Sequence, residues 1–331
     1  MAKKNNETEI ISAYVSEAEE FGAPVPPREE VQMTPMKPVM ESSVPPPTYA
    51  DGTPFGKDSG IKYASNLGYL KIPIDTLPTK GMFYPNETSI SIRAARGEEI
   101  KHWSTMNDQD MEQLHLVDDI LTYMLERCCV VRMEGTSGNA WKELKQLDKI
   151  YLILAIRDFT FIDGENTLQV PYGEGKDIPI TKDMIDFLHI PSDIMDFYDG
   201  DEKCFVFNIN GQVIRMHIPS IGVTQWLKSY VQAKQKSRDI FDEDFVRYAP
   251  MLIKDHKKLN VKSYEELVAS TRFWGQKEWS VVSYVARELE TAATPKINYT
   301  DENGTEVEIP FNFRGGIKGL FLISNPLLGL R

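Results

Sequence analysis

A rigid turn followed by a helix that is apolar on nearly every side is the feature that most constrains the fold of this chain. The turn lies in residues 77–85, with the sequence LPTKGMFYP. Pro78 fixes its own φ, and Gly81 can adopt the positive φ that a tight turn requires. The helix is expected at residues 141–158, and its apolar surface predicts that it lies in a core. We therefore expect the turn and the helix to hold the fold rather than to form a catalytic site.

Two charged residues interrupt the apolar surface of this helix. Asp148 and Arg157 lie nine positions apart, about two and a half helical turns. We expect them to form ion pairs with other elements and to set the register of the helix, while Leu154 lies in the core. The structural motif predicted from this region comprises Leu77, Pro78, Gly81, Tyr84, Asp148, Leu154 and Arg157.

The remaining periodicities predict a body of helices and short hairpins. Asn210-Gly211 between two apolar runs is the strongest short-range hairpin signal, and Ser220 can cap the helix that follows. The predicted fold class is α+β, a helix-rich body with small antiparallel β-hairpins and a long extended N-terminal arm. Strands or hairpins are expected at 67–76, 90–93, 203–218 and 296–310, and helices at 95–103, 109–131, 141–158, 223–239, 242–254, 263–274 and 276–292.

The N-terminal segment is rich in proline and lacks hydrophobic periodicity. Nine of the chain's 20 prolines fall in residues 1–60. This composition predicts an extended arm, which is either a dispensable disordered tail or an arm that orders along neighbouring subunits. Its candidate partner-binding residues are Met36, Met40, Tyr49 and Phe55. The predicted domains are the arm, 1–60, and a body, 61–331, with a helical part at 61–200 and a hairpin–helices–hairpin part at 201–331.

Charge and composition narrow the classes of partner. The chain has 49 acidic and 37 basic residues and a formal net charge of −12. This balance argues against nucleic acid as the main partner, because neutralising phosphates needs a basic face. No apolar run reaches about 18 residues, so no membrane span is expected. The N-terminus lacks the apolar core of a signal peptide, and the three cysteines argue against a disulfide framework, so cytoplasmic synthesis is expected.

No residue pattern matches a catalytic or cofactor-binding motif. The five histidines are scattered over different predicted elements, and none lies beside a Ser or Cys in a known nucleophile motif. The chain contains no CxxC motif and no His pair at i,i+4, so the sequence predicts no metal ligands. We therefore expect no enzyme activity, no cofactor and no metal.

The turn, an acidic helical middle and the helix with Asp148, Leu154 and Arg157 follow one another in an order that resembles the T4-type bacteriophage baseplate proteins. In that family an LPSKG-x-x-Y segment precedes a D-x-x-x-L-L-x-A-x-R helix. The resemblance implies a structural or assembly component of a contractile tail baseplate or hub, made in the host cytoplasm and present in the virion tail. Its implied partners are other tail proteins, such as hub, tape-measure or tube-initiator subunits.

Two other functions stay open at this point. The chain could be a transient chaperone of tail assembly that is absent from the mature virion, or, with less support, a tail-associated hydrolase. The family often has a zinc-ribbon-like CxxC hairpin in its last third, whereas the hairpin expected at 296–310 has no cysteines. We therefore expect that hairpin without metal.

The apolar C-terminal segment is a second candidate for partner binding. Monomeric proteins rarely leave a contiguous apolar stretch exposed, so this segment should dock either on the body or on a partner. Its candidate partner-binding residues are Leu320, Phe321, Leu322, Ile323, Leu327 and Leu328.

Overall fold

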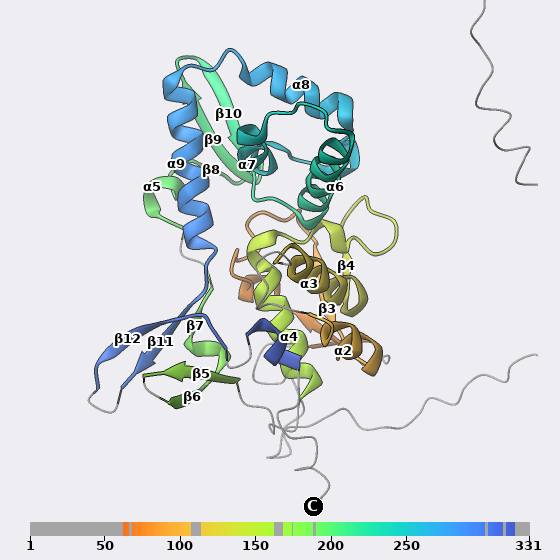
Figure 1. Cartoon of the computed structure of the whole chain (residues 1–331), viewed down its shortest axis with the longest axis vertical. Helices are drawn as coiled ribbons and strands as arrows, with labels where there is room; N and C mark the ends of the chain where they lie inside the picture. The colour runs from red at the N-terminus through yellow and green to blue at the C-terminus, as the bar shows by residue number, and fades with distance from the viewer. Residues whose placement is uncertain are drawn as a thin grey trace, which may run out of the picture. The chain divides into compact units, whose positions relative to one another are not determined.

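Figure 1 shows the computed structural model of the chain, which describes residues 62–65, 68–106, 114–161, 168–173, 175–187, 190–301, 304–313 and 316–321. The chain separates into two units, residues 1–45 and 46–331, and every described residue belongs to the second unit. The arm predicted at 1–60 lies outside the described residues, together with its candidate residues Met36, Met40, Tyr49 and Phe55.

A four-stranded antiparallel sheet and three helices build the first core. The strands lie in the order β1-β2-β3-β4. Strand β3 alternates serine and isoleucine, and Ile90 and Ile92 are buried, as expected for a strand with one face on a core. Leu154 of α4 lies in the same core. The elements are β1 (Lys62–Ser65), β2 (Tyr69–Ile72), β3 (Ser89–Ile92), α2 (Gly97–Trp103), α3 (Leu114–Cys128), β4 (Cys129–Arg132) and α4 (Lys149–Thr160).

A tight hairpin and a long helix build a second core. The hairpin turns at Asn210 and Gly211, whose φ angles are 53° and 83°. Two positive φ angles are what a two-residue type I′ turn requires, so the predicted hairpin is confirmed. Phe205 and Met216 face each other in the register and pack in one core with Val282. The elements are α5 (Ser192–Met195), β8 (Tyr198–Asp199), β9 (Cys204–Ile209), β10 (Gln212–Met216) and α9 (Gln276–Ala292).

Three capped helices build a third core. The Ser220 hydroxyl accepts a hydrogen bond from Val223 N at 3.4 Å, as the sequence predicted. Asp242 and Asn260 cap the next two helices in the same way. These side chains bond backbone N–H groups that the first turn of a helix leaves unpaired. The helices are α6 (Ile221–Ser237), α7 (Glu243–Leu252) and α8 (Val261–Thr271).

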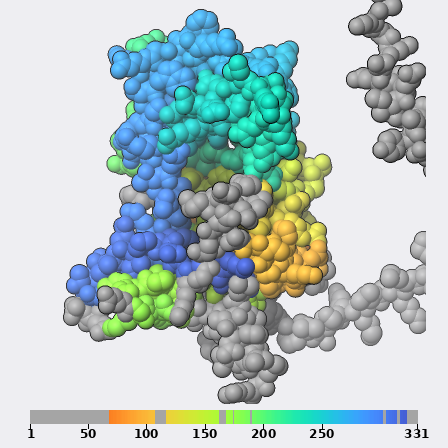
Figure 2. Space-filling model, in the orientation of Figure 1, coloured from red at the N-terminus to blue at the C-terminus, as the bar shows by residue number. Residues whose placement is uncertain are grey.

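Two further hairpins lie against each other, in green and dark blue in Figure 2. The hairpin expected at 296–310 is confirmed, whereas the β5–β6 hairpin was not predicted. The rings of Tyr172 and Tyr299 join the two hairpins, with centroids 5.4 Å apart. The strands are β5 (Leu168–Tyr172), β6 (Lys176–Ile180), β7 (Ile185–Asp186), β11 (Lys296–Thr300) and β12 (Glu306–Pro310), and β7 pairs with β11.

The buried helix starts later than expected. Helix α4 begins at Lys149. The residues before it form two 3₁₀ turns, Trp141–Glu143 and Gln146–Asp148, instead of α-helix. Gln146 N donates a hydrogen bond to Pro219 O at 2.9 Å, within the segment that precedes α6. Backbone groups that bond another segment are not available for the i→i−4 bonds of an α-helix, so this long-range contact displaces the start of the helix.

The amphipathic helix expected at 109–131 also ends early. Helix α3 stops at Cys128, and the next four residues form β4. Cys129 lies opposite Ile92 of β3 in the antiparallel register. A short apolar run fits a strand and a helix equally well, so the free edge of β3 decides the outcome.

The C-terminal segment docks on the body as far as the structure describes it. Leu320 and Phe321 are buried in the first core, and the Phe321 ring lies 4.7 Å from that of Trp103. Trp103 Nε1 donates to Lys318 O at 3.0 Å. Buried side chains cannot bind a partner, which corrects the candidate role of Leu320 and Phe321. The other candidates, Leu322, Ile323, Leu327 and Leu328, lie outside the described residues.

The helices and small antiparallel sheets confirm the predicted α+β class. In the part of the chain that the structure describes, no helix combines the length and the apolar character needed to cross a membrane.

Replacing Leu154 with Asp should destabilise the protein strongly. The side chain is 1% exposed, and burying a carboxylate there should lower the free energy of unfolding by about 3–5 kcal/mol. Thermal denaturation followed by circular dichroism measures the effect. Phe273→Asp is the matched control. Phe273 is 91% exposed, so the melting temperature of this variant should be close to that of wild type. Equal melting temperatures for Leu154→Asp and wild type would contradict the core assignment.

Candidate functional site

A single buried carboxylate joins the turn at 77–85 to helix α4. Asp148 is fully buried just before the helix. Its Oδ1 accepts a hydrogen bond from Thr79 N at 3.0 Å, and its Oδ2 accepts from Thr79 Oγ1 and from the Tyr84 hydroxyl, both at 2.8 Å. Tyr84 in turn accepts from Lys145 N at 2.9 Å. Five polar groups from four residues are therefore satisfied by one another inside the protein.

The local sequence explains why the turn presents its donors to Asp148. Lys80 N donates to Leu77 O at 2.8 Å, which places Pro78 at the second turn position, where its fixed φ is favourable. Gly81 has a φ of 74°, and a Cβ there would lie 3.0 Å from Cγ2 of Ile74. A side chain at this position would therefore strain the turn and crowd its neighbour.

Burial dominates the electrostatics of this network. It raises the pKa of Asp148 to about 6, although the hydrogen bonds from Thr79 and Tyr84 oppose the shift. Burial also lowers the pKa of the Lys145 ammonium and, together with the nearby Asp148 charge, raises the pKa of Tyr84 well above its usual range. Perturbed groups of this kind gather at functional sites, but they also occur in structural networks.

The network borders a cleft of about 440 Å³. His217 lines the cleft and is buried, with its backbone N–H donating to Met251 O. Burial lowers the pKa of His217 to about 4, and the charges of Lys145 and Lys254 add to the effect. The polar side chains that line the cleft include Tyr84, Glu143, Lys145, His217, Lys254 and Lys257. The cleft is therefore walled by groups of both charges.

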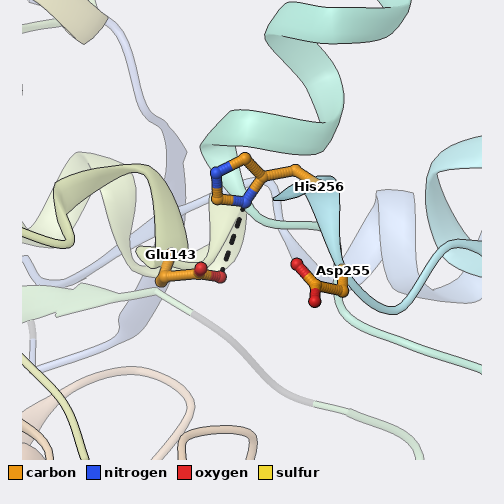
Figure 3. A group of neighbouring side chains, drawn as sticks. All are labelled: Glu143, Asp255 and His256. Atoms are coloured by element: carbon orange, nitrogen blue, oxygen red, sulfur yellow. Dashed lines mark ion pairs between the residues drawn. The ribbon is translucent and has the colours of Figure 1, made fainter. Parts of the chain in front are cut away.

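Three potential metal ligands meet beside this cleft, and Figure 3 shows their side chains. Glu143 comes from the first of the two 3₁₀ turns before α4, whereas Asp255 and His256 come from the connection between α7 and α8. One ligand atom from each residue lies within 4.8 Å of the other two, and His256 Nδ1 is 3.6 Å from Glu143 Oε2. Burial would raise the pKa of Glu143, but His256 and Lys257 more than offset it, and the pKa falls to about 2.

The structure brings most of the sequence-predicted motif together. Leu77, Pro78, Gly81 and Tyr84 form the turn that meets Asp148, and Asp148 bonds neutral donors instead of the cation that we expected. Leu154 lies in the core.

Arg157 lies apart from this network. Its Nε donates to Leu320 O at 2.9 Å, and it pairs with the adjacent Asp158 at 3.5 Å. It therefore helps to hold the C-terminal segment on α4.

Apart from Tyr84, sequence reasoning missed the polar residues that line the cleft. Lys145 and His217 carry no local pattern, because their burial depends on segments far away in the chain. Glu143 and His256 were passed over because ligand spacing was sought within short motifs. Gly222 approaches His256 closely, since a Cβ there would lie 2.5 Å from Cγ of the ring, but the helix expected at 223–239 did not include this glycine.

Replacing Asp148 with Ala should remove the acceptor for three donors and leave a small cavity. We expect the free energy of unfolding to fall by about 2–4 kcal/mol, because buried donors would lose their partner. Urea denaturation at neutral pH measures the change. Asp244→Ala, at an exposed position in the first turn of α7, should differ from wild type by less than about 0.5 kcal/mol. Equal losses for the two variants would argue against the network.

The buried His217 should make the protein less stable in acid. Its folded pKa of about 4 lies below its ordinary value, so the unfolded chain binds more protons between about pH 4 and 6.5. The stability that His217 contributes is therefore present above pH 6.5 and is lost as the pH falls towards 4. His217→Gln should reduce the loss between pH 7 and 4.5 by about 2–3 kcal/mol, measured by urea denaturation at each pH.

The matched control for this measurement is His102→Gln, which changes an exposed ring. Asp148 acts in the opposite direction, because its raised pKa makes its contribution to stability fall as the pH rises from about 4 to 6. Asp148 is present in every protein compared, so its effect cancels in the comparison. Parallel stability curves for His217→Gln and wild type would contradict the prediction.

No family model, curated protein or solved structure matches this chain in the comparisons with known proteins. The likeness of residues 77–161 to baseplate proteins therefore stays a prediction from the sequence.

Proposed function

We propose that this chain is a structural or assembly component of a contractile phage tail, at the baseplate or hub, and that it acts by binding other tail proteins. The observation that carries the proposal is the buried contact between the two halves of the motif. Thr79 and Tyr84 of the turn bond Asp148 before α4, all within the body. Motif residues that bond one another serve the fold, which is the role that the turn and the apolar helix predict for them and which fits a component without a catalytic site.

Exposed apolar side chains support action through protein binding. Ile240 in the loop between α6 and α7 is fully exposed, and Phe273 between α8 and α9 is 91% exposed. Covering large apolar side chains at the surface with a partner lowers the free energy and so favours binding. The net charge of −12 is suited to partners with basic surfaces.

Mass spectrometry of purified virions tests the proposal. A tail component should be present at several copies in virions and should sediment with isolated tails. Presence in infected cells only, bound to hub or tape-measure proteins, would support the transient chaperone instead. Absence from virions and failure to co-purify with any tail protein would overturn both forms of the proposal.

A surface variant adds a test at the level of residues. Ile240→Ser combined with Phe273→Ser should reduce incorporation into tails at least tenfold, because the proposed contact would lose two apolar side chains. The melting temperature should not change, because both side chains lie outside the cores. Val213→Ser is the matched control, since Val213 is a half-exposed residue on β10. Normal incorporation of the double variant would show that these two loops are not the contact surface.

A further inference from the structure

We propose that Glu143, Asp255 and His256 form a binding site for a divalent transition-metal ion of the zinc type. The three side chains supply two carboxylates and one imidazole from two segments that are distant in the sequence. Figure 3 shows Glu143 facing His256, with Asp255 beside them. Glu143 lies within residues 77–161 but is not one of the motif residues that carry the resemblance, and Asp255 and His256 lie outside that stretch. None of the three belongs to the exposed loops proposed to bind a partner.

The distances match a metal site better than a hydrogen bond. His256 Nδ1 lies 3.6 Å from Glu143 Oε2, which is longer than an N–H···O hydrogen bond. Two ligand atoms that share a tetrahedral zinc ion at bond lengths of about 2.0–2.2 Å lie about 3.3–3.5 Å apart. With one ligand atom from each of the three residues within 4.8 Å of the others, side-chain adjustments of about 1 Å close the set around one ion.

The imidazole supplies the second observation. Among the described residues, His256 Nδ1 has no hydrogen-bond partner, although the atom is buried. Buried polar atoms are nearly always bonded, and a bound cation is one explanation for an exception. An imidazole binds a metal ion through the lone pair of a ring nitrogen, and Nδ1 is the ring nitrogen of His256 that lies nearest to the Glu143 carboxylate.

The surrounding structure holds the ligands in place. The His256 ring lies against Gly222 in the first turn of α6, where a Cβ would lie 2.5 Å from the ring. Asp255 Oδ1 accepts a hydrogen bond from Lys257 N at 2.8 Å, which limits the rotation of its carboxylate. Glu143 follows the buried Trp141 in a 3₁₀ turn. A bound ion would therefore join this turn to the connection between α7 and α8.

Charge and ligand chemistry select the class of ion. One imidazole and two carboxylates suit zinc and similar ions, whereas calcium and magnesium require six or more oxygen ligands. Lys257 Nζ lies 3.0 Å from Glu143 Oε1 and competes with a cation for that carboxylate. Removing the ammonium should therefore strengthen metal binding.

Titration of the chelator-treated full-length chain with zinc chloride, followed by calorimetry, tests the proposal. Wild type should bind one zinc ion, and cobalt chloride should produce the visible absorption of a tetrahedral complex. His256→Gln, Glu143→Gln and Asp255→Asn should each weaken zinc binding at least tenfold. Glu134→Gln is the matched control, because Glu134 lines the same cleft but is not one of the ligands.

Lys257→Met keeps all three ligands and should bind zinc more tightly than wild type, so one arm of the test leaves every ligand in place. Near-ultraviolet circular dichroism of each variant establishes that the fold is retained. The proposal is overturned if wild type binds no stoichiometric zinc. It is also overturned if zinc binding is the same in wild type and in the folded ligand variants, because the ion would then sit elsewhere, for example on Cys128, Cys129 or Cys204.

Discussion

The buried carboxylate of Asp148 is the interaction on which the arrangement of the first core depends. It accepts three hydrogen bonds from Thr79 and Tyr84, so the turn at 77–85 cannot leave the start of α4 without exposing several polar groups to an apolar interior. Burial works against the charge and raises its pKa to about 6. The network is therefore specific in its geometry even though burying the carboxylate is itself costly.

The segment from Glu143 to Asp148, just before α4, also joins the first core to the capped helices α6, α7 and α8. Ile221 N donates to Leu144 O at 2.9 Å, and Gln146 N donates to Pro219 O at the same distance. These backbone bonds lie between Glu143 and Asp148, so the candidate metal ligands and the buried network share one stretch of chain. Disturbing the carboxylate of Asp148 should therefore be felt at the cleft as well as in the core.

Function in this chain divides between its inside and its surface. The motif that carries the resemblance is buried within the fold, so the proposed partner binding would rest on exposed side chains such as Phe273. The proposed metal site would add a local clamp where the 3₁₀ turn at Glu143 meets His256. A clamp at such a joint would stiffen the contact between two segments without taking part in partner binding.

Local signals in the sequence were enough to predict the Asn210-Gly211 hairpin, the Ser220 cap and the α+β class, because each depends on residues within one turn of the chain. The start of α4 and the strand that begins at Cys129 followed from tertiary structure alone. So did the meeting of Glu143 with His256. Pairing partners and burial are set by segments far apart in the chain, and a local pattern contains no information about which distant group will satisfy a backbone bond or desolvate a charge.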